Sequence, residues 1–179
     1  MDKVKFGIIG VGNMGSSHLH FFQSGKIKNG EVVAIADINP EKLAAAREKC
    51  PGKYACYASG DELIDKADVD AVIIAVPHYD HPRLSIRALE KGLNVICEKP
   101  AGVYTKQVKE MNAVAERCKG LFTMMYNQRT NPLYIKMHDI VKNGEIGEIR
   151  RVNWIITNWF RTQFYYDSGS WRATWKGEG

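Results

Sequence analysis

Short apolar runs separated by stretches of helical periodicity make up the first 126 residues of the chain. The apolar runs have the length and the aliphatic content of β-strands. The run from Ala71 to Val76 contains no polar residue, which is typical of a strand buried on both faces of a parallel sheet. The pattern predicts strands at residues 5–9, 32–36, 54–57, 71–76, 93–97 and 121–126.

Strands that alternate with helices along the chain predict an α/β fold. The expected architecture is a Rossmann-type, doubly wound parallel sheet of six strands in the order 3-2-1-4-5-6. In such a sheet the ligand lies across the carboxyl ends of the strands. The candidate site is therefore expected at this edge, where four residues follow strands: Gly10, Asp37, Pro77 and Lys99.

A Gly-x-Gly-x-x-Gly sequence follows the first expected strand, at Gly10, Gly12 and Gly15. In a dinucleotide-binding turn the first glycine allows the tight turn, and the second lets a pyrophosphate approach the backbone. The third lets the helix pack close to the strand. The N–H groups at the helix start then bind the phosphates. Glycine-rich turns also have purely structural uses, but the strand before and the helix after this one favour the dinucleotide interpretation.

Asp37 ends the second expected strand, about 20 positions after Gly15, where the acidic residue that binds a ribose belongs. Its carboxylate accepts hydrogen bonds from both ribose hydroxyls of NAD and repels the 2′-phosphate of NADP. Ile38 follows, where an NADP enzyme often places an Arg or a Ser, so the sequence favours NAD. Lys42 and Arg47 on the next helix keep NADP as the less favoured alternative.

The pattern changes after Tyr126. A helix is expected from Pro132 to about Asn143, and a long strand over residues 149–160. One helix and one strand are too little for an independent core, so this part is interpreted as the opening of a second domain. The apolar side chains of the strand would form an exposed edge: Trp154, Trp159 and Phe160.

Composition and charge restrict the class of protein. The 179 residues are 25% charged and 45% hydrophobic and carry a formal net charge of +5, which is ordinary for a globular protein. We expect no membrane segment and no signal peptide, because no apolar run reaches transmembrane length and the chain passes directly into its first strand. A cytoplasmic location is therefore expected. Basic residues are spread along the chain, which argues against a nucleic-acid partner.

The sequence also predicts no metal site. None of the four cysteines has the ligand spacing of a zinc site, so all are expected to be structural. The spacing of His78 and His81 permits metal binding, but only Asp80 is nearby as a third ligand.

Several separated motifs resemble those of one family, the glucose–fructose oxidoreductase / inositol dehydrogenase / rhizopine-catabolism (Gfo/Idh/MocA) oxidoreductases. The resemblance covers the whole chain, and its most specific part is the Glu-Lys-Pro together with the Asn-x-Arg. The family usually has Thr-Pro-Asn where this chain has Val76-Pro77-His78. The matching motifs are Gly10 to Gly15, Asp37, Val76 to His81, Glu98-Lys99-Pro100, Tyr126-Asn127-Gln128-Arg129 and Trp171-Arg172.

The resemblance implies an NAD(P)-dependent oxidoreductase that transfers a hydride between a nicotinamide and a secondary hydroxyl of a sugar or polyol. In such a reaction a general base removes the hydroxyl proton, and a Lys hydrogen-bonds the oxygen and stabilises its negative charge. Lys99 matches that Lys, and a surface lysine at a strand end is the alternative. Similar proteins often have a cis peptide at the position of Lys99-Pro100, and sequence alone does not decide between cis and trans.

Family members continue well past the length of this chain, into a segment with a catalytic His and Asp and an open antiparallel sheet. The resemblance thus implies an NAD(P)-binding Rossmann domain at residues 1–127. Residues 128–179 would be an incomplete N-terminal part of the substrate and dimerisation domain. On this interpretation the chain is a fragment that binds cofactor without the catalytic His and Asp, and the full-length protein is a homo-oligomer.

The remaining site residues also come from these motifs. Lys99 and Arg129 are expected to contact the substrate, with a salt bridge at a domain interface as the alternative for Arg129. His18 and His20 are expected to lie away from the strand ends. The expected cofactor-binding residues are Gly10, Gly12, Asn13, Met14, Asp37, Ile38, Val76, Pro77, His78, His81, Glu98, Asn127, Trp171 and Arg172.

Two other classes of function are alternatives. A non-enzymatic dinucleotide-binding sensor or regulatory module would use the glycine turn and Asp37, but it would not need Lys99 or Arg129. A nucleic-acid binder is permitted by the charge and supported by little else.

Overall fold

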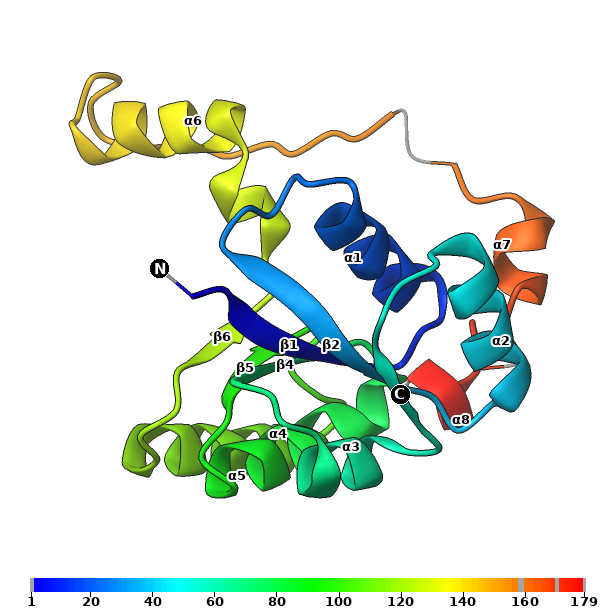
Figure 1. Cartoon of the computed structure of the whole chain (residues 1–179). Coiled ribbons are helices and arrows are strands. Elements are labelled where there is room, and N and C mark those ends of the chain that lie inside the picture. The colour runs from blue at the N-terminus through cyan, green and yellow to red at the C-terminus, as the bar shows by residue number, and fades with distance from the viewer. Residues whose placement is uncertain (1, 158–159, 170, 179) are drawn as a thin grey trace. The chain divides into compact units, whose positions relative to one another are not determined.

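The computed structural model describes residues 2–157, 160–169 and 171–178. Its centre is a sheet of six parallel strands in the order β3-β2-β1-β4-β5-β6, which confirms the predicted fold class (Figure 1). All the strands expected before residue 127 are present, with ends shifted by one or two residues at most. They are β1 Val4–Ile9, β2 Gly30–Ala36, β3 Ala55–Tyr57, β4 Ala71–Ile74, β5 Asn94–Cys97 and β6 Phe122–Met124.

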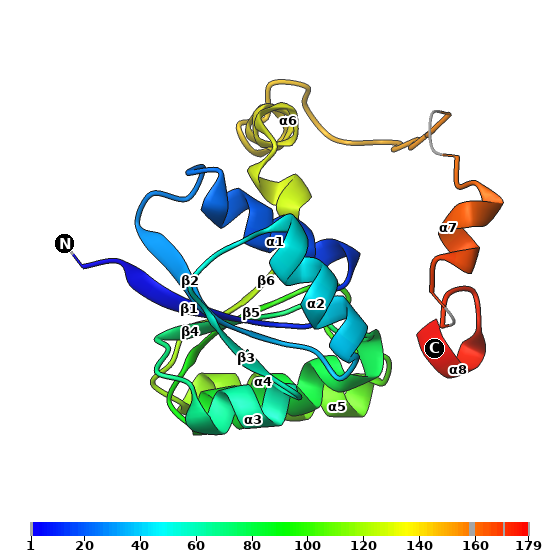
Figure 2. The ribbon, with the colours of Figure 1, turned by 45° about the vertical axis from the view of Figure 1, so that its right-hand side comes forward.

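Helices cover both faces of the sheet, as right-handed crossovers between parallel strands require. Figures 1 and 2 show α1 (Asn13–Gln23) and α2 (Pro40–Lys49) on one face. The other face carries α3 (Gly60–Lys66), α4 (His81–Glu90) and α5 (Thr105–Arg117). The connections change face between β1 and β4, and such a switch point is where doubly wound sheets bind ligands.

Local signals fix where α2 and α3 begin. Asn39 accepts a hydrogen bond from the Glu41 N–H at 2.8 Å, and Pro40 follows as the first helical residue. Ser59 caps α3 in the same way, through the Glu62 N–H at 3.1 Å. These caps determine where the loops at the strand ends begin and end.

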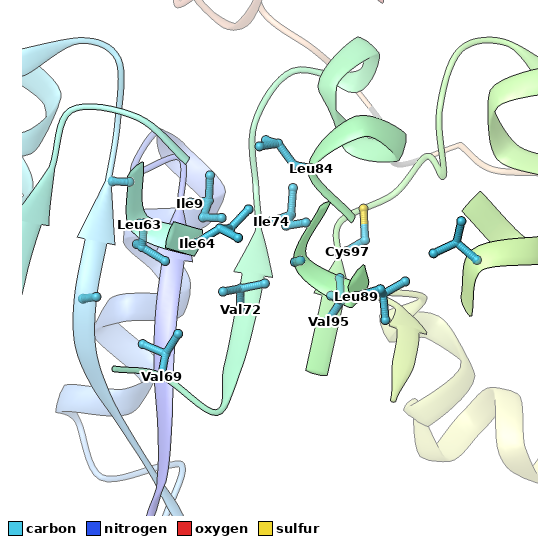
Figure 3. Close-up of a cluster of buried hydrophobic side chains, with 14 residues drawn as sticks. Ile9, Leu63, Ile64, Val69, Val72, Ile74, Leu84, Leu89, Val95 and Cys97 are labelled. Carbon is cyan, nitrogen blue, oxygen red and sulfur yellow. The ribbon is translucent and has the colours of Figure 1, made fainter. Parts of the chain in front are cut away.

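Two apolar clusters bury the sheet, one on each face. Neighbouring residues of β1 point to opposite faces: Ile8 packs in the cluster under α1 and α2, and Ile9 in the cluster shown in Figure 3. All four residues of β4 are buried, as expected for a central strand of a parallel sheet. Ile74 lies at the centre of the cluster in Figure 3.

Contacts divide the chain into two compact units. The first contains residues 1–125 and 174–179, and the second contains residues 126–173. In the first unit the last helix, α8 (Trp175–Glu178), contacts the 3₁₀ turn η1 (His78–Asp80) that precedes α4. The second unit contains η2 (Asn127–Thr130), α6 (Pro132–Lys142) and α7 (Gln163–Asp167). No helix in the described ranges is both long and apolar enough to cross a bilayer.

The prediction of a strand over residues 149–160 is wrong for the part of this stretch that the structure describes. Residues 149–157 and Phe160 have no strand, and Trp159 lies outside the described residues. A strand needs a partner for its backbone N–H and C=O groups, and the described part of the second unit offers none. The apolar side chains are exposed as expected, with Ile155 at 83% and Phe160 at 86%.

Ile74→Ala is expected to lower the free energy of unfolding by about 2–5 kcal/mol, because it leaves a cavity among fully buried side chains. Ile155→Ala is the control and is expected to change it by less than about 0.5 kcal/mol, because that side chain is exposed. Urea unfolding followed by circular dichroism measures both values. Similar losses in the two variants would contradict the placement of Ile74 in the core.

Candidate functional site

The surroundings of the three glycines in the turn after β1 differ, and each glycine is required for a different reason. Gly10 has a φ of +88°, and a Cβ there would lie 2.7 Å from the Ala75 carbonyl oxygen. A Cβ on Gly15 would lie 1.8 Å from the Gly10 carbonyl oxygen, so α1 packs directly on the turn. Gly12 has an ordinary φ of −67° and no atom within 4 Å of its Cβ position. Packing explains Gly10 and Gly15, whereas Gly12 borders open space that a phosphate group can occupy.

The amino end of α1 is open to an anion. Gly12, the cap residue, has no side chain to accept from the first turn, and this turn of the described helix contains no acidic residue. The first N–H groups therefore lack partners within the helix, and the positive end of its dipole is not neutralised. Asn13 and Met14, both predicted cofactor contacts, are exposed at this end. A pyrophosphate fits the chemistry of this position.

Asp37 follows β2 and lies against the glycine turn. One carboxylate oxygen accepts from the Val11 N–H at 3.0 Å, and the other accepts from the Asn39 N–H at 2.9 Å. A carboxylate has about four acceptor positions, so capacity for two ribose hydroxyls remains. Ile38 is 86% exposed and brings no positive charge to a 2′-phosphate. The predicted ribose-binding residue and the predicted phosphate turn are therefore neighbours, and the residues present fit a dinucleotide.

Val76 and Pro77 follow β4 at the same edge of the sheet. The next residue, His78, begins η1 and is half-buried. Its Nδ1 lies 3.4 Å from the Glu178 carbonyl oxygen. Burial of the ring lowers the pKa of His78, which favours its neutral form.

The turn after β5 presents Lys99. The Glu98 N–H donates to the Ile74 carbonyl at 2.9 Å, which attaches this turn to the end of β4. Lys99-Pro100 is a cis peptide. Lys99 is exposed, and within the described ranges its ammonium has no hydrogen bond or ion pair. Such an ammonium is available to a substrate oxygen at this edge.

Glu98 has a partner that the sequence analysis missed. Its Oε1 lies 2.8 Å from Nε2 of His18, and the two residues are only 5% and 8% exposed. The expectation that His18 lies away from the strand ends is therefore wrong. Its position one helical turn after Gly15, on the buried face of α1, was the available signal. Burial by itself raises the pKa of Glu98, but the hydrogen bond and charge of His18 outweigh it and lower that pKa.

Four predicted site residues belong to the second unit, and the structure describes them within that unit. Asn127 and Arg129 lie in η2. Arg172 donates to a tyrosine hydroxyl of α7 at 2.6 Å, and its guanidinium lies 4.9 Å from the Trp171 ring. Their roles toward cofactor and substrate stay predictions.

The described residues contain no group of three His, Cys, Asp or Glu side chains that could hold a metal ion. His81 contacts the Val76 and Pro100 carbonyl oxygens with its two ring nitrogens, so neither nitrogen is open to a metal. Burial raises the pKa of the Cys97 thiol to about 12, as suits a structural cysteine.

Comparison with known proteins shows which family the chain matches. The family model that matches residues 4–126 is described as an oxidoreductase family with an NAD-binding Rossmann fold. The matched range contains the glycine turn, Asp37 and Lys99. This match confirms both the predicted family resemblance and the predicted NAD-binding Rossmann fold.

Individual relatives agree with the family. The chain is 32% identical over 150 residues to inositol 2-dehydrogenase 1 of Paenarthrobacter aurescens, a match that covers 82% of this chain and 43% of the relative. A crystal structure of scyllo-inositol dehydrogenase from Lactobacillus casei, with bound NAD(H) and scyllo-inositol, is 27% identical with a TM-score of 0.76. That match covers 83% of this chain and 43% of the dehydrogenase.

The WlbA dehydrogenase of Chromobacterium violaceum, in complex with NADH and UDP-GlcNAcA, is 26% identical with a TM-score of 0.85. This match covers 100% of the chain and 51% of the dehydrogenase. The chain therefore spans about half the length of these relatives.

Gly12→Ala is expected to weaken NADH binding about tenfold or more, because the added methyl group occupies the open space beside the turn. Its melting temperature should change little, since the backbone angle is ordinary and no atom lies near. Gly15→Ala is the contrast and should cost about 1–3 kcal/mol of stability or more through overpacking. Nicotinamide fluorescence and thermal unfolding measure the two effects, and unchanged NADH binding by Gly12→Ala would contradict the phosphate role.

The stability of the chain in acid is expected to depend on Glu98. The pKa of this carboxyl is lowered in the folded state from its ordinary value of 4.5. The contribution of Glu98 to the free energy of unfolding is therefore complete above the ordinary pKa and is lost as the pH falls through the lowered pKa. Glu98→Gln should be less stable than the unmodified chain at about pH 6, and the difference should shrink below about pH 4. Urea unfolding over this pH range measures the difference, and a constant gap would contradict the assignment.

Proposed function

Because the chain belongs to the Gfo/Idh/MocA family of oxidoreductases, whose model matches residues 4–126, we propose that its first unit binds NAD for hydride transfer. The other reactant is a secondary hydroxyl of a sugar or polyol. The observation that carries this proposal is that three groups suited to a dinucleotide and its substrate lie at the same edge of the sheet. They are the open phosphate turn at Gly12, the ribose acceptor Asp37 and the exposed ammonium of Lys99.

The cofactor would be held by backbone more than by side chains. The first N–H groups of α1 bind the pyrophosphate, and Asp37 accepts from the adenosine ribose. The bound nicotinamide ring supplies the acceptor or donor of the hydride. Because Asp37 already accepts from the glycine turn, its carboxylate is held in place before the ribose arrives, which reduces the entropy lost on binding.

On the substrate side, Lys99 would hydrogen-bond the hydroxyl oxygen and stabilise the negative charge that develops on it as the proton leaves. The relatives include inositol dehydrogenases and a dehydrogenase solved in complex with UDP-GlcNAcA, and a sugar or polyol is proposed as the substrate class of this chain. A sensor that only bound the dinucleotide would have no use for an exposed ammonium at this position.

The proton acceptor is proposed to come from outside the residues of this chain, as the family resemblance implies. Of the five histidines, His18 and His81 contact Glu98 and backbone carbonyls, and His20 and His138 are exposed on helices α1 and α6. The fifth, His78, is assigned to the cofactor side of the site, and its Nδ1 lies 3.4 Å from the Glu178 carbonyl oxygen. The chain by itself would then bind NAD and turn over slowly or not at all. Homo-oligomerisation and a cytoplasmic location are predictions for the whole protein.

A titration of the chain with NADH and NADPH, followed by nicotinamide fluorescence, is the direct test. NADH should bind at least about tenfold more tightly than NADPH, because Asp37 repels a 2′-phosphate. Asp37→Ala should weaken the binding of NADH and reduce the difference in affinity between NADH and NADPH. Glu41→Ala, a neighbouring acidic residue outside the site, is the matched control and should change neither affinity.

The same samples test the reaction. Chain with NAD and with myo-inositol, scyllo-inositol or glucose should form NADH slowly or not at all. A rate equal to that of a complete dehydrogenase would contradict an external proton acceptor. Failure of both cofactors to bind would contradict the proposed function itself.

A further inference from the structure

Two buried histidines hold the turn that carries Lys99, one from each face of the sheet. His18 comes from α1 and His81 is the first residue of α4, and Figures 1 and 2 show these helices on opposite faces. The two residues are 8% and 1% exposed. The proposed hydride transfer uses neither ring, so the burial of two polar side chains at this place has another reason.

On the amino side of Lys99, His18 acts through Glu98. One Glu98 oxygen lies 2.8 Å from the His18 ring, and the other accepts from the Lys99 backbone N–H at 3.3 Å. The carboxylate thus links the imidazole to the backbone of Lys99. Helix α1 is a firm anchor for this link, since no space separates its Gly15 from the turn after β1.

On the carboxyl side of Lys99, His81 contacts two backbone segments. Its Nδ1 lies 2.6 Å from the Pro100 carbonyl oxygen, and its Nε2 lies 2.8 Å from the Val76 carbonyl oxygen. Carbonyl oxygens accept hydrogen bonds and cannot donate them, whereas a neutral imidazole has a single N–H. Only the protonated ring donates to both oxygens, and short distances are typical of such charge-assisted bonds.

The ring of His81 therefore continues the connection between two strands beyond their ends. β4 and β5 pair from Ala71 and Asn94 to Ile74 and Cys97. Farther along the two chains, His81 bridges Val76 and Pro100. The neighbouring His78 ring is 5.9 Å away, and burial lowers the pKa of His78, so this neighbour does not add a second full charge.

The position of Lys99 depends on the backbone segments next to it. Within the part of the chain that the structure describes, the ammonium has no ion pair or hydrogen bond. Its location is set by the backbone on both sides, and errors of about 1 Å in the placement of a reacting group cost about a hundredfold in rate.

We propose that His18 and His81 are positioning residues for Lys99. His18 holds Glu98 on one side, and His81, as an imidazolium, holds Pro100 against the end of β4 on the other. The proposal rests on the proposed role of Lys99 in hydride transfer, but its tests are made on the turn itself.

The first test observes the ring protons of His81 in the full chain labelled with ¹⁵N-histidine, at about pH 7.5, one unit above the ordinary histidine pKa. Two ring N–H protons that exchange slowly with water are expected for His81. The signals are assigned by their loss in His81→Gln. One N–H and one bare ring nitrogen would overturn the imidazolium.

The second test measures amide hydrogen exchange at Lys99. His18→Leu and His81→Leu should each speed it at least about tenfold, because each removes one attachment of the turn. His20→Leu, a matched control on the exposed side of α1, should change it less than about twofold. His18→Gln, whose amide can donate to Glu98, should restore most of the protection even if a leucine variant does not fold. In His20→Leu the NADH affinity should also stay within about threefold, because the phosphate turn and Asp37 are intact.

Unchanged Lys99 exchange in His18→Leu and His81→Leu would overturn the proposal, whatever the activity. The proposed function fails separately if Lys99→Met, placed in a complete family enzyme that carries this first unit, transfers hydride at the normal rate. In that case the exchange results still decide whether the two histidines hold the turn.

Discussion

Helix α1 can follow β1 directly only because its backbone passes the Gly10 carbonyl at a distance that leaves no room for a side chain on Gly15. Much of the site depends on this contact. It sets the direction in which the first N–H groups of the helix point, and it brings the Val11 N–H to Asp37. It also carries His18 down the buried face of the helix to Glu98. Phosphate turn, ribose acceptor and lysine turn therefore share one support.

The polar groups buried beside this support are costly to leave unpaired. A buried carboxylate and a buried imidazole each require a hydrogen-bond partner, and removal of either one leaves a charge or a donor unpaired. Glu98 satisfies this need twice, through His18 and through the Lys99 N–H. A conformation that separates α1 from the β5 turn would break the contact with His18 and leave Glu98 with the Lys99 N–H alone. The buried pair thus attaches the β5 turn to α1 at the edge where the cofactor and Lys99 are proposed to meet.

Much of this arrangement could be predicted from the sequence, because its signals are local. The glycine spacing, the apolar run of β4 and the Asn39-Pro40 cap each specify nearby backbone. The pairing of His18 with Glu98 could not be predicted in this way, since it joins residues 80 positions apart that only the folded sheet brings together. The expected strand over residues 149–160 failed for a related reason: its apolar pattern is strand-like, but a strand exists only with a partner.

The position of β1 at the centre of the sheet has a consequence for synthesis. β1 pairs with β2 on one side and with β4 on the other. About 60 further residues must leave the ribosome after Ile9 before β4 is complete, which takes several seconds at about 5–20 residues per second. During that time one edge of β1 is unpaired, and the side chains of Ile8 and Ile9 are only partly covered. A nascent chain of this family is therefore exposed to wrong strand pairing at its most central strand, and a chaperone that covers this edge would act at the most sensitive moment.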